Sequence, residues 1–241
     1  MRAATALLLL WAVAPALAAD DPYKVKLLLG GGYEVGTQSF SQTVSLEQFA
    51  ETATIATAYE AEAAPGIDVG VQFNAFKHVG VAVAGTLYDR DLGGRFEASF
   101  PHPFFFDRNR EATDSVSGKM KETAVHASVV AFGHSGSLDF SGWAGVSFFK
   151  VEADLLTNVN YSHEYPYDSV TVTSKPVTTA SDRPIGFNVG ASLDWRFSKS
   201  VGFGVQGRFS QAQAKLSAPN AADTEVDAGG FQVGGGLRIY F

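Results

Sequence analysis

The stretch Phe231-Gln232-Val233-Gly234-Gly235-Gly236-Leu237-Arg238-Ile239-Tyr240-Phe241 decides the fold of this chain. Its side chains divide between two faces, because successive residues of a β-strand point to opposite sides. One face carries Phe231, Val233, Gly235, Leu237, Ile239 and Phe241. The other face carries Gln232, Gly234, Gly236, Arg238 and Tyr240. The stretch therefore predicts a strand with one face suited to lipid and one suited to a polar interior, ending on an aromatic residue.

Seven further segments alternate in the same way. They cover residues 24–36, 64–76, 79–88, 120–132, 138–148, 185–197 and 201–210, and residues 228–241 form the eighth. Short connections at 77–78, 133–136 and 198–200 separate longer ones at 37–62, 89–119, 153–182 and 214–227. Barrels of the bacterial outer membrane have short periplasmic turns and long outer loops. We therefore predict an all-β fold: an eight-stranded antiparallel up-and-down transmembrane β-barrel with four long surface loops, three short periplasmic turns and both termini in the periplasm.

A soluble β-sandwich or a lipocalin-like barrel is the competing architecture, because alternation alone does not reveal which face meets lipid. The rhythm of the connections, the terminal Phe241 and the aromatic residues at the strand ends favour the membrane barrel.

The last six residues resemble the C-terminal sorting signal of outer-membrane barrels, with Gly236, Ile239 and Phe241 at its characteristic positions. Gly234 stands where that signal usually has a polar residue. Over its mature length the chain resembles the small eight-stranded outer-membrane proteins, the group of the outer-membrane protein A barrel domain and outer-membrane proteins X and W. The resemblance implies a monomer in the bacterial outer membrane, surrounded by outer-membrane lipid and recognised by the barrel-assembly machinery through its C-terminal strand.

Composition limits the remaining possibilities. The 241 residues are 46% apolar, carry a formal charge of −7 and include no cysteine, which excludes disulfides and thiolate metal sites. An acidic chain without a basic patch is a poor nucleic-acid binder, so we expect no nucleic-acid partner. Arg2, the apolar run Ala6–Ala14 and the small residues Ala16 and Ala18 predict a signal peptide over residues 1–18. Residues 19–241 then form the barrel domain.

The non-lipid face of the predicted strands supplies a polar lumen with charges of both signs. Its expected network consists of Lys26, Glu34, Asp68, Gln72, Glu122, His126, Asp139, Asp194, Arg196, Gln206, Arg208 and Arg238. Eight strands leave an interior that side chains just fill, and buried charges require partners. We expect a polar plug that stabilises the barrel; the alternative is a narrow porin-like path for ions or solutes.

One pair of residues suggests chemistry. His126 and Ser128 lie two apart on one strand, hence on one face, and Asp139 is predicted on the same face of the next strand. The pair resembles the His-x-Ser pair of the eight-stranded lipid A deacylase family, but Val129 stands where that family has asparagine. A lipid hydrolase needs these side chains toward lipid, whereas alternation points them inward. We therefore expect no catalytic, cofactor or metal residues, with a lipid A-modifying enzyme as the second alternative.

The long connections offer sites for partners. Residues 37–62, 89–119 and 153–182 are expected as surface loops that meet a surface partner. Phe100, Phe104, Phe105 and Phe106 form a possible partner patch, unless they pack against other loops. Ser45–Gln48 has the spacing of a capping box and suggests a short helix. The sequence as a whole predicts a non-enzymatic structural or surface-interaction scaffold in the outer membrane.

Overall fold

The computed structural model describes residues 23–241. The expected signal peptide and its cleavage before Ala19 lie outside the described residues. Residues 23–241 contain no helix that is long and apolar enough to cross a membrane.

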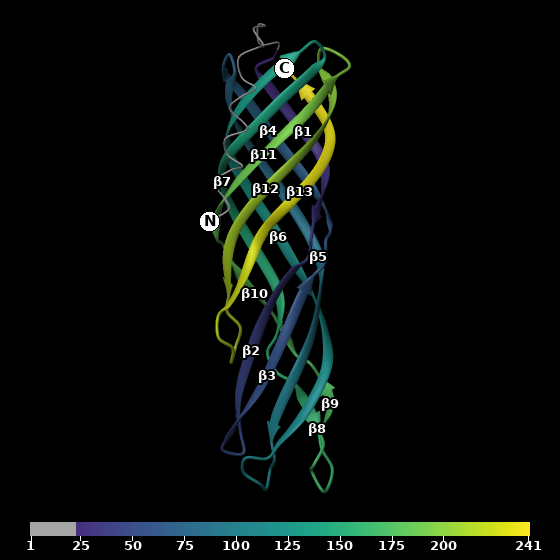
Figure 1. The fold of residues 1–241 in the computed structure, drawn as a ribbon, viewed down its shortest axis with the longest axis vertical. Coiled ribbons are helices and arrows are strands. Elements are labelled where there is room, and N and C mark those ends of the chain that lie inside the picture. Colours follow the sequence, from purple (N-terminus) through teal and green to yellow (C-terminus); the bar gives the residue numbers. More distant parts are fainter. Residues whose placement is uncertain (1–22) are drawn as a thin grey trace, which may run out of the picture.

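Eight strands form a closed antiparallel ring (Figure 1). In chain order they are β1 (Val25–Val35), β4 (Pro65–Phe76), β5 (Val79–Pro101), β6 (Asn109–Ser135), β7 (Leu138–Leu156), β11 (Ile185–Arg196), β12 (Val201–Leu216) and β13 (Thr224–Tyr240). Each pairs with the next, and β13 closes the ring by pairing with β1 from Lys26↔Tyr240 to Val35↔Phe231. The predicted eight-stranded barrel is confirmed, and its last strand pairs with its first.

The short connections lie together at one end of the ring. Residues 77–78, 136–137 and 197–200 join neighbouring strands there, and Gly136 has a φ of 61°, a left-handed conformation that glycine adopts without steric cost. Phe241 is at the same end, where its N–H donates to the carbonyl of Val25 at 2.9 Å and its carbonyl accepts from the N–H of Lys24 at 2.8 Å. The backbone of the last residue is therefore part of the barrel seam.

The long connections are present, but most of their residues are strand rather than loop. Residues 37–62 form the hairpin of β2 (Gln38–Gln48) and β3 (Glu51–Ala61), so the suggested helix at Ser45–Gln48 is wrong. Residues 89–119 mainly continue β5 and β6, which leaves a turn at 102–108. Residues 153–182 include the end of β7 and three short strands, β8 (Asn160–Ser162), β9 (Thr171–Ser174) and β10 (Val177–Asp182). In the fourth connection only residues 217–223 lie between β12 and β13.

The polarity of the two strand faces reverses along the barrel. On β5 the outward residues Val79 to Leu87 are exposed and apolar, whereas the outward residues that follow are Asp89, Asp91, Arg95 and Glu97. The inward face changes in the opposite sense, since Leu92, Phe96 and Phe100 are buried there. The outward face changes in the same sense after Phe148 on β7 and after Phe209 on β12. β6 runs in the opposite direction, so its outward face is polar up to Thr123 and apolar after it. We call the part with the apolar exterior the proximal half and the rest the distal half.

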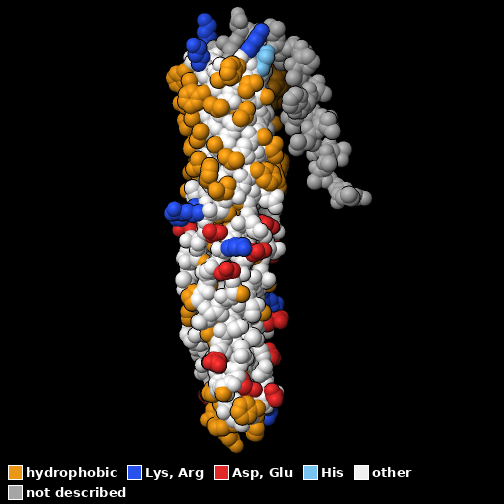
Figure 2. Space-filling model, turned by 90° about the vertical axis from the view of Figure 1, so that its left-hand side faces the viewer, with side chains coloured by type: hydrophobic (Ala, Val, Ile, Leu, Met, Phe, Trp, Pro, Cys, Tyr) orange, Lys and Arg blue, Asp and Glu red, His pale blue; other side chains and the backbone are white. Residues whose placement is uncertain are grey.

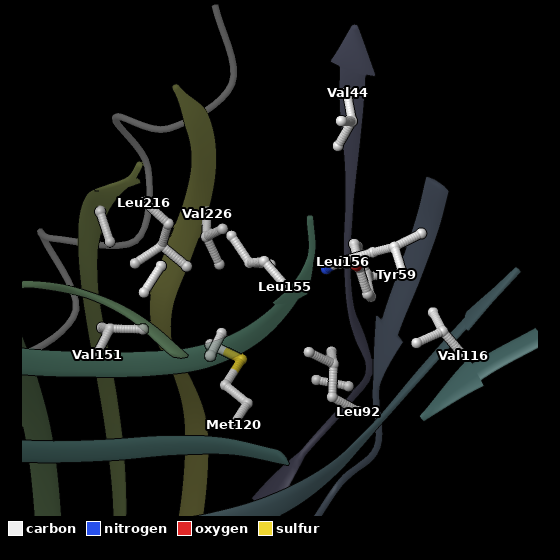
Figure 3. Close-up of a cluster of buried hydrophobic side chains, with 14 of the residues drawn as sticks. Val44, Tyr59, Leu92, Val116, Met120, Val151, Leu155, Leu156, Leu216 and Val226 are labelled. Atoms are coloured by element: carbon white, nitrogen blue, oxygen red, sulfur yellow. Dashed lines mark hydrogen bonds between the residues drawn. The ribbon is translucent and has the colours of Figure 1, made fainter. Parts of the chain in front are cut away.

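The distal half encloses an apolar core. Its buried side chains come from β2, β3, β5, β6, β7, β10, β12 and β13. Among them are Val44, Leu92, Met120, Leu155, Leu156, Leu216 and Val226 (Figure 3). Tyr59 lies among them; its hydroxyl oxygen accepts the N–H of Leu156 at 2.7 Å, and burial raises the pKa of this phenol. Because the interior is apolar and the exterior polar, the distal half has the side-chain arrangement of a water-soluble protein.

The exterior shows where the change occurs. On the face that Figure 2 shows, apolar side chains cover the proximal half, then charged side chains follow, then a mostly polar wall with an apolar cap at the distal end. Exposed apolar side chains occur on all eight strands of the proximal half, so they form a belt around it. Exposed ion pairs follow the belt directly, among them Lys150–Glu152 at 2.8 Å and Lys121–Asp89 at 3.9 Å. An exposed apolar belt of this extent on a barrel has the character of a lipid-facing surface.

Candidate functional site

The proximal lumen is filled by ion pairs. At the level nearest the short turns, Asp194 accepts from Lys26 Nζ at 2.9 Å with one oxygen and from Arg238 Nε at 3.0 Å with the other. All three residues are at most 4% exposed. Gly204 makes room for this cluster, because a Cβ there would collide with the Asp194 carboxylate and lie 2.8 Å from Arg238 Nε. The glycine is thus required by a close approach of charged side chains.

Two further pairs extend the network. Arg196 Nε lies 3.1 Å from an oxygen of Asp139, near the turn end. Deeper in the lumen, Asp68 accepts from Arg208 at 2.9 Å and also from the Gln206 amide. The Gln206 carbonyl oxygen accepts from Arg238 at 3.1 Å, which links this pair to the first cluster. Gln72 lies in the same lumen, where it donates to Asn74 at 2.8 Å.

The third cluster lies where the polar lumen meets the apolar distal core. Arg90 forms an ion pair with Glu34 and lies 3.6 Å from Glu122, and all three are 1% exposed. Glu122 also accepts the N–H of Gly229 at 2.9 Å. Sequence reasoning missed Arg90 because residue 90 fell in an expected loop. The signal was available: Arg90 continues the inward parity of Thr86 and Tyr88.

The charges of this lumen network balance. Its cations are Lys26, Arg90, Arg196, Arg208 and Arg238, and its anions are Glu34, Asp68, Glu122, Asp139 and Asp194, so the sum is 5 − 5 = 0. A cavity of about 50 Å³ remains beside Lys26, His126 and Arg208, which is room for a few water molecules. Every residue of the expected network lies on the inner wall. The ion pairs described above bring its charged residues together, and Arg90 joins the network as an additional member.

His126 and Ser128 share the inner face but do not contact each other through a hydrogen bond. His126 Nδ1 is 2.7 Å from Ser147 Oγ, and its Nε2 is 3.2 Å from Thr86 Oγ1. Ser128 Oγ donates to Asn188 Oδ1 at 2.8 Å. Both imidazole nitrogens are therefore engaged by hydroxyl groups that are not Ser128. Asp139 pairs with Arg196 and supplies no orienting contact to His126 in this arrangement. Within residues 23–241 no three His, Asp or Glu side chains converge as a metal site requires.

The second candidate site is the turn at residues 102–108, which we call the apical turn. Its side chains Phe104, Phe105 and Phe106 are 70%, 55% and 74% exposed. Phe100, expected in the same patch, is instead buried in the distal core and packs on Tyr161 with ring centroids 4.3 Å apart. Residue 100 has the inward parity of β5, which explains the difference. The exposed patch therefore consists of three consecutive phenylalanines.

Several contacts hold the apical turn. The N–H of His102 donates to the carbonyl of Arg108 at 2.9 Å, and the N–H of Asp107 donates to Glu51 of β3 at 2.9 Å. Arg108 pairs with Asp168 at 2.8 Å and lies over the Phe105 ring at 5.5 Å. On the wall nearby, Lys175 donates to Asp114 at 2.9 Å and lowers the pKa of that carboxyl. A hydrogen bond within the turn and contacts to two other segments, at Glu51 and Asp168, thus fix the turn, although its rings stay exposed.

The fold of this chain is similar to the solved structures of small bacterial outer-membrane β-barrel proteins. The attachment invasion locus protein Ail of Yersinia pestis matches with 12% identity and a TM-score of 0.38, over 89% of this chain and 99% of Ail. Neisserial surface protein A matches with 13% identity and a TM-score of 0.40, over 93% of this chain and 100% of that one. The outer membrane protease OmpT of Escherichia coli matches with 8% identity and a TM-score of 0.47, over 93% and 99%. No protein-family model and no curated protein sequence matches the chain.

Proposed function

We propose that the chain is an integral outer-membrane protein that acts as a non-enzymatic scaffold. The proximal half anchors it in lipid, and the distal half presents the apical turn to a partner outside the cell. Both termini lie on the periplasmic side in this arrangement. The reversal of side-chain polarity between the two halves carries the proposal, because it supplies a lipid-facing belt and a water-facing column in one barrel.

The column is long enough to raise the turn well above the lipid. Residues 89–101 of β5 lie beyond the apolar belt. At about 3.3 Å per residue and a strand tilt of about 40°, they span roughly 30 Å along the barrel axis. The apolar core inside the column keeps the strands packed over this length. A column of packed strands is suited to presenting a binding surface away from the membrane, which a flexible loop is not.

The filled interior weighs against transport as the main function. Buried, balanced ion pairs occupy the proximal lumen, and the apolar core occupies the distal half. An ion that followed the axis would have to leave water and pass apolar side chains. We expect no stable conductance when the folded protein is added to a planar bilayer. A steady current that changes in an Arg208→Ala variant would favour the channel instead.

Cysteine labelling in intact cells tests the arrangement, because the chain has no cysteine of its own. We expect a membrane-impermeant maleimide to label Thr113→Cys on the distal wall of intact cells. Lys199→Cys in a short turn should react only after the outer membrane is permeabilised. Val129→Cys on the apolar belt should react only after unfolding. Labelling of Lys199→Cys but not of Thr113→Cys in intact cells would show the opposite orientation and refute the proposal.

A further inference from the structure

We infer that the apical turn docks onto a neutral lipid bilayer opposite the cell, with Phe104, Phe105 and Phe106 inserted into its interfacial region. The inference rests on the proposed function, since it needs the distal half to face outward. It names the chemistry of the partner: the zwitterionic lipid surface of another membrane.

The shape of the turn is the first argument. Three consecutive residues of one closed turn expose their rings, and the rings have different neighbours, since Phe104 lies 5.5 Å from the Tyr167 ring and Phe105 lies 4.9 Å from the His102 ring. A rigid protein pocket would have to match each ring separately, whereas a fluid bilayer interface conforms to a protruding group. Phenylalanine side chains gain free energy when their apolar area leaves water. The turn is therefore suited to a soft apolar surface.

The rigidity of the turn is the second argument. The hydrogen bonds of His102 to Arg108 and of Asp107 to Glu51 hold the backbone before any partner is present. Asp107 has a φ of 56°, a left-handed conformation that aspartate tolerates better than most residues. Docking then requires little ordering of the chain, so the apolar contacts are not offset by a large loss of conformational entropy.

Other aromatic side chains enlarge the apolar end. Phe49, at the turn between β2 and β3, is 47% exposed, and Tyr165 is 86% exposed. Tyr165 and Tyr167 lie with ring centroids 6.0 Å apart, and Tyr167 lies 5.5 Å from Phe104. Figure 2 shows the resulting apolar cap at the far end of an otherwise polar wall. Tyrosine suits a membrane interface because one end of its ring is apolar and the other is polar.

The charged side chains around the apical turn indicate which kind of lipid surface it can approach. Beside the three phenylalanines, the turn and the segments that hold it carry the exposed Arg108 and the buried Arg110 against Glu51, Asp107, Glu164 and Asp168, a sum of 2 − 4 = −2. A negative rim repels a negative membrane surface and has no such conflict with zwitterionic headgroups. The apical turn should therefore prefer neutral bilayers, and anionic lipid should weaken its binding.

Vesicle flotation tests the inference on the folded protein in lipid nanodiscs. We expect phosphatidylcholine vesicles to bind the protein, and binding to fall when phosphatidylserine is added. The variant F104S/F105S/F106S should lose at least about tenfold in partition coefficient, since three rings no longer leave water. V177S is the matched control: Val177 is an exposed apolar side chain on the distal wall, 43% exposed, and its loss should leave binding unchanged.

A second measurement locates the inserted residue. In a Phe106→Trp variant, vesicles of brominated phosphatidylcholine should quench the new tryptophan, while Trp143 and Trp195 remain in the nanodisc with unbrominated lipid. Absence of wild-type binding to phosphatidylcholine, binding that survives the triple substitution, or preference for anionic vesicles would overturn the inference and assign the patch to a protein partner. These results are separable from failure of the scaffold proposal, which cysteine labelling in cells decides independently.

Discussion

Replacing Arg90 by methionine should strongly destabilise the barrel. Methionine keeps much of the length of the side chain but removes the guanidinium group that lies between Glu34 and Glu122. Both carboxylates are 1% exposed, so neither can be hydrated in place of the lost partner. The two carboxyl groups would then face each other at the base of the apolar distal core with no cation between them.

The structure gives the size of the effect. Removing one member of a buried ion pair costs about 3–5 kcal/mol, because the remaining charge is left without compensation. The loss should be increased because Arg90 lies beside two carboxylates, and reduced because Glu122 still accepts the hydrogen bond from the N–H of Gly229. We therefore expect R90M to lower the free energy of unfolding by about 3 kcal/mol.

Urea unfolding of the protein refolded into lipid vesicles measures this loss. Arg95→Met is the matched control, because Arg95 lies on the same strand with an exposed outward side chain, and its substitution should change the free energy of unfolding by at most about 0.5 kcal/mol. In an E34Q/E122Q background, R90M should cost about 1 kcal/mol or less, since no buried charge is left unpaired. Equal losses in both backgrounds, or a loss below about 1 kcal/mol for R90M alone, would refute the role assigned to this cluster.

Three further variants probe the belt, the distal core and the closing strand. V129R places a charge on the apolar belt, where Val129 is 60% exposed. It should lower the free energy of unfolding in lipid vesicles by about 2–4 kcal/mol if this side chain lies near the bilayer midplane, and an unchanged free energy would show that the belt does not lie in the membrane. L92A opens a cavity in the distal core and should lower the stability of that core by about 2–5 kcal/mol. The loss should appear as faster amide hydrogen exchange in β3 and in the part of β5 beyond the belt, and an equal increase in exchange along the whole barrel would contradict a separate distal core. F241K keeps the backbone hydrogen bonds to Lys24 and Val25 but removes the terminal aromatic ring. Heat-dependent gel mobility should show less folded barrel in the membranes of cells but normal refolding of the purified protein. Normal insertion in cells would contradict the role of Phe241 in the sorting signal.

Sequence reasoning failed beyond the apolar belt for a physical reason. Outward residues such as Arg95 and Glu97 are polar there, and a polar residue at a position where the preceding outward residues are apolar is typical of a loop. Alternation in fact continues with its faces exchanged, since Phe96 and Phe100 point inward. A strand that leaves lipid and enters water must exchange its faces if it is to keep a packed interior. That exchange is readable in the sequence once it is looked for.

The sequence by itself determined the eight strands of the proximal half and their antiparallel order. These features depend on side-chain alternation and on the shortness of three turns, which are local properties of the chain. Only the tertiary structure decided which charges meet. Glu34 on β1 and Arg90 on β5 are separated by a whole strand, β4, and their contact depends on the stagger of neighbouring strands around the closed ring. The partners of His126 were decided in the same way, because Thr86 and Ser147 reach it from the two strands that pair with β6.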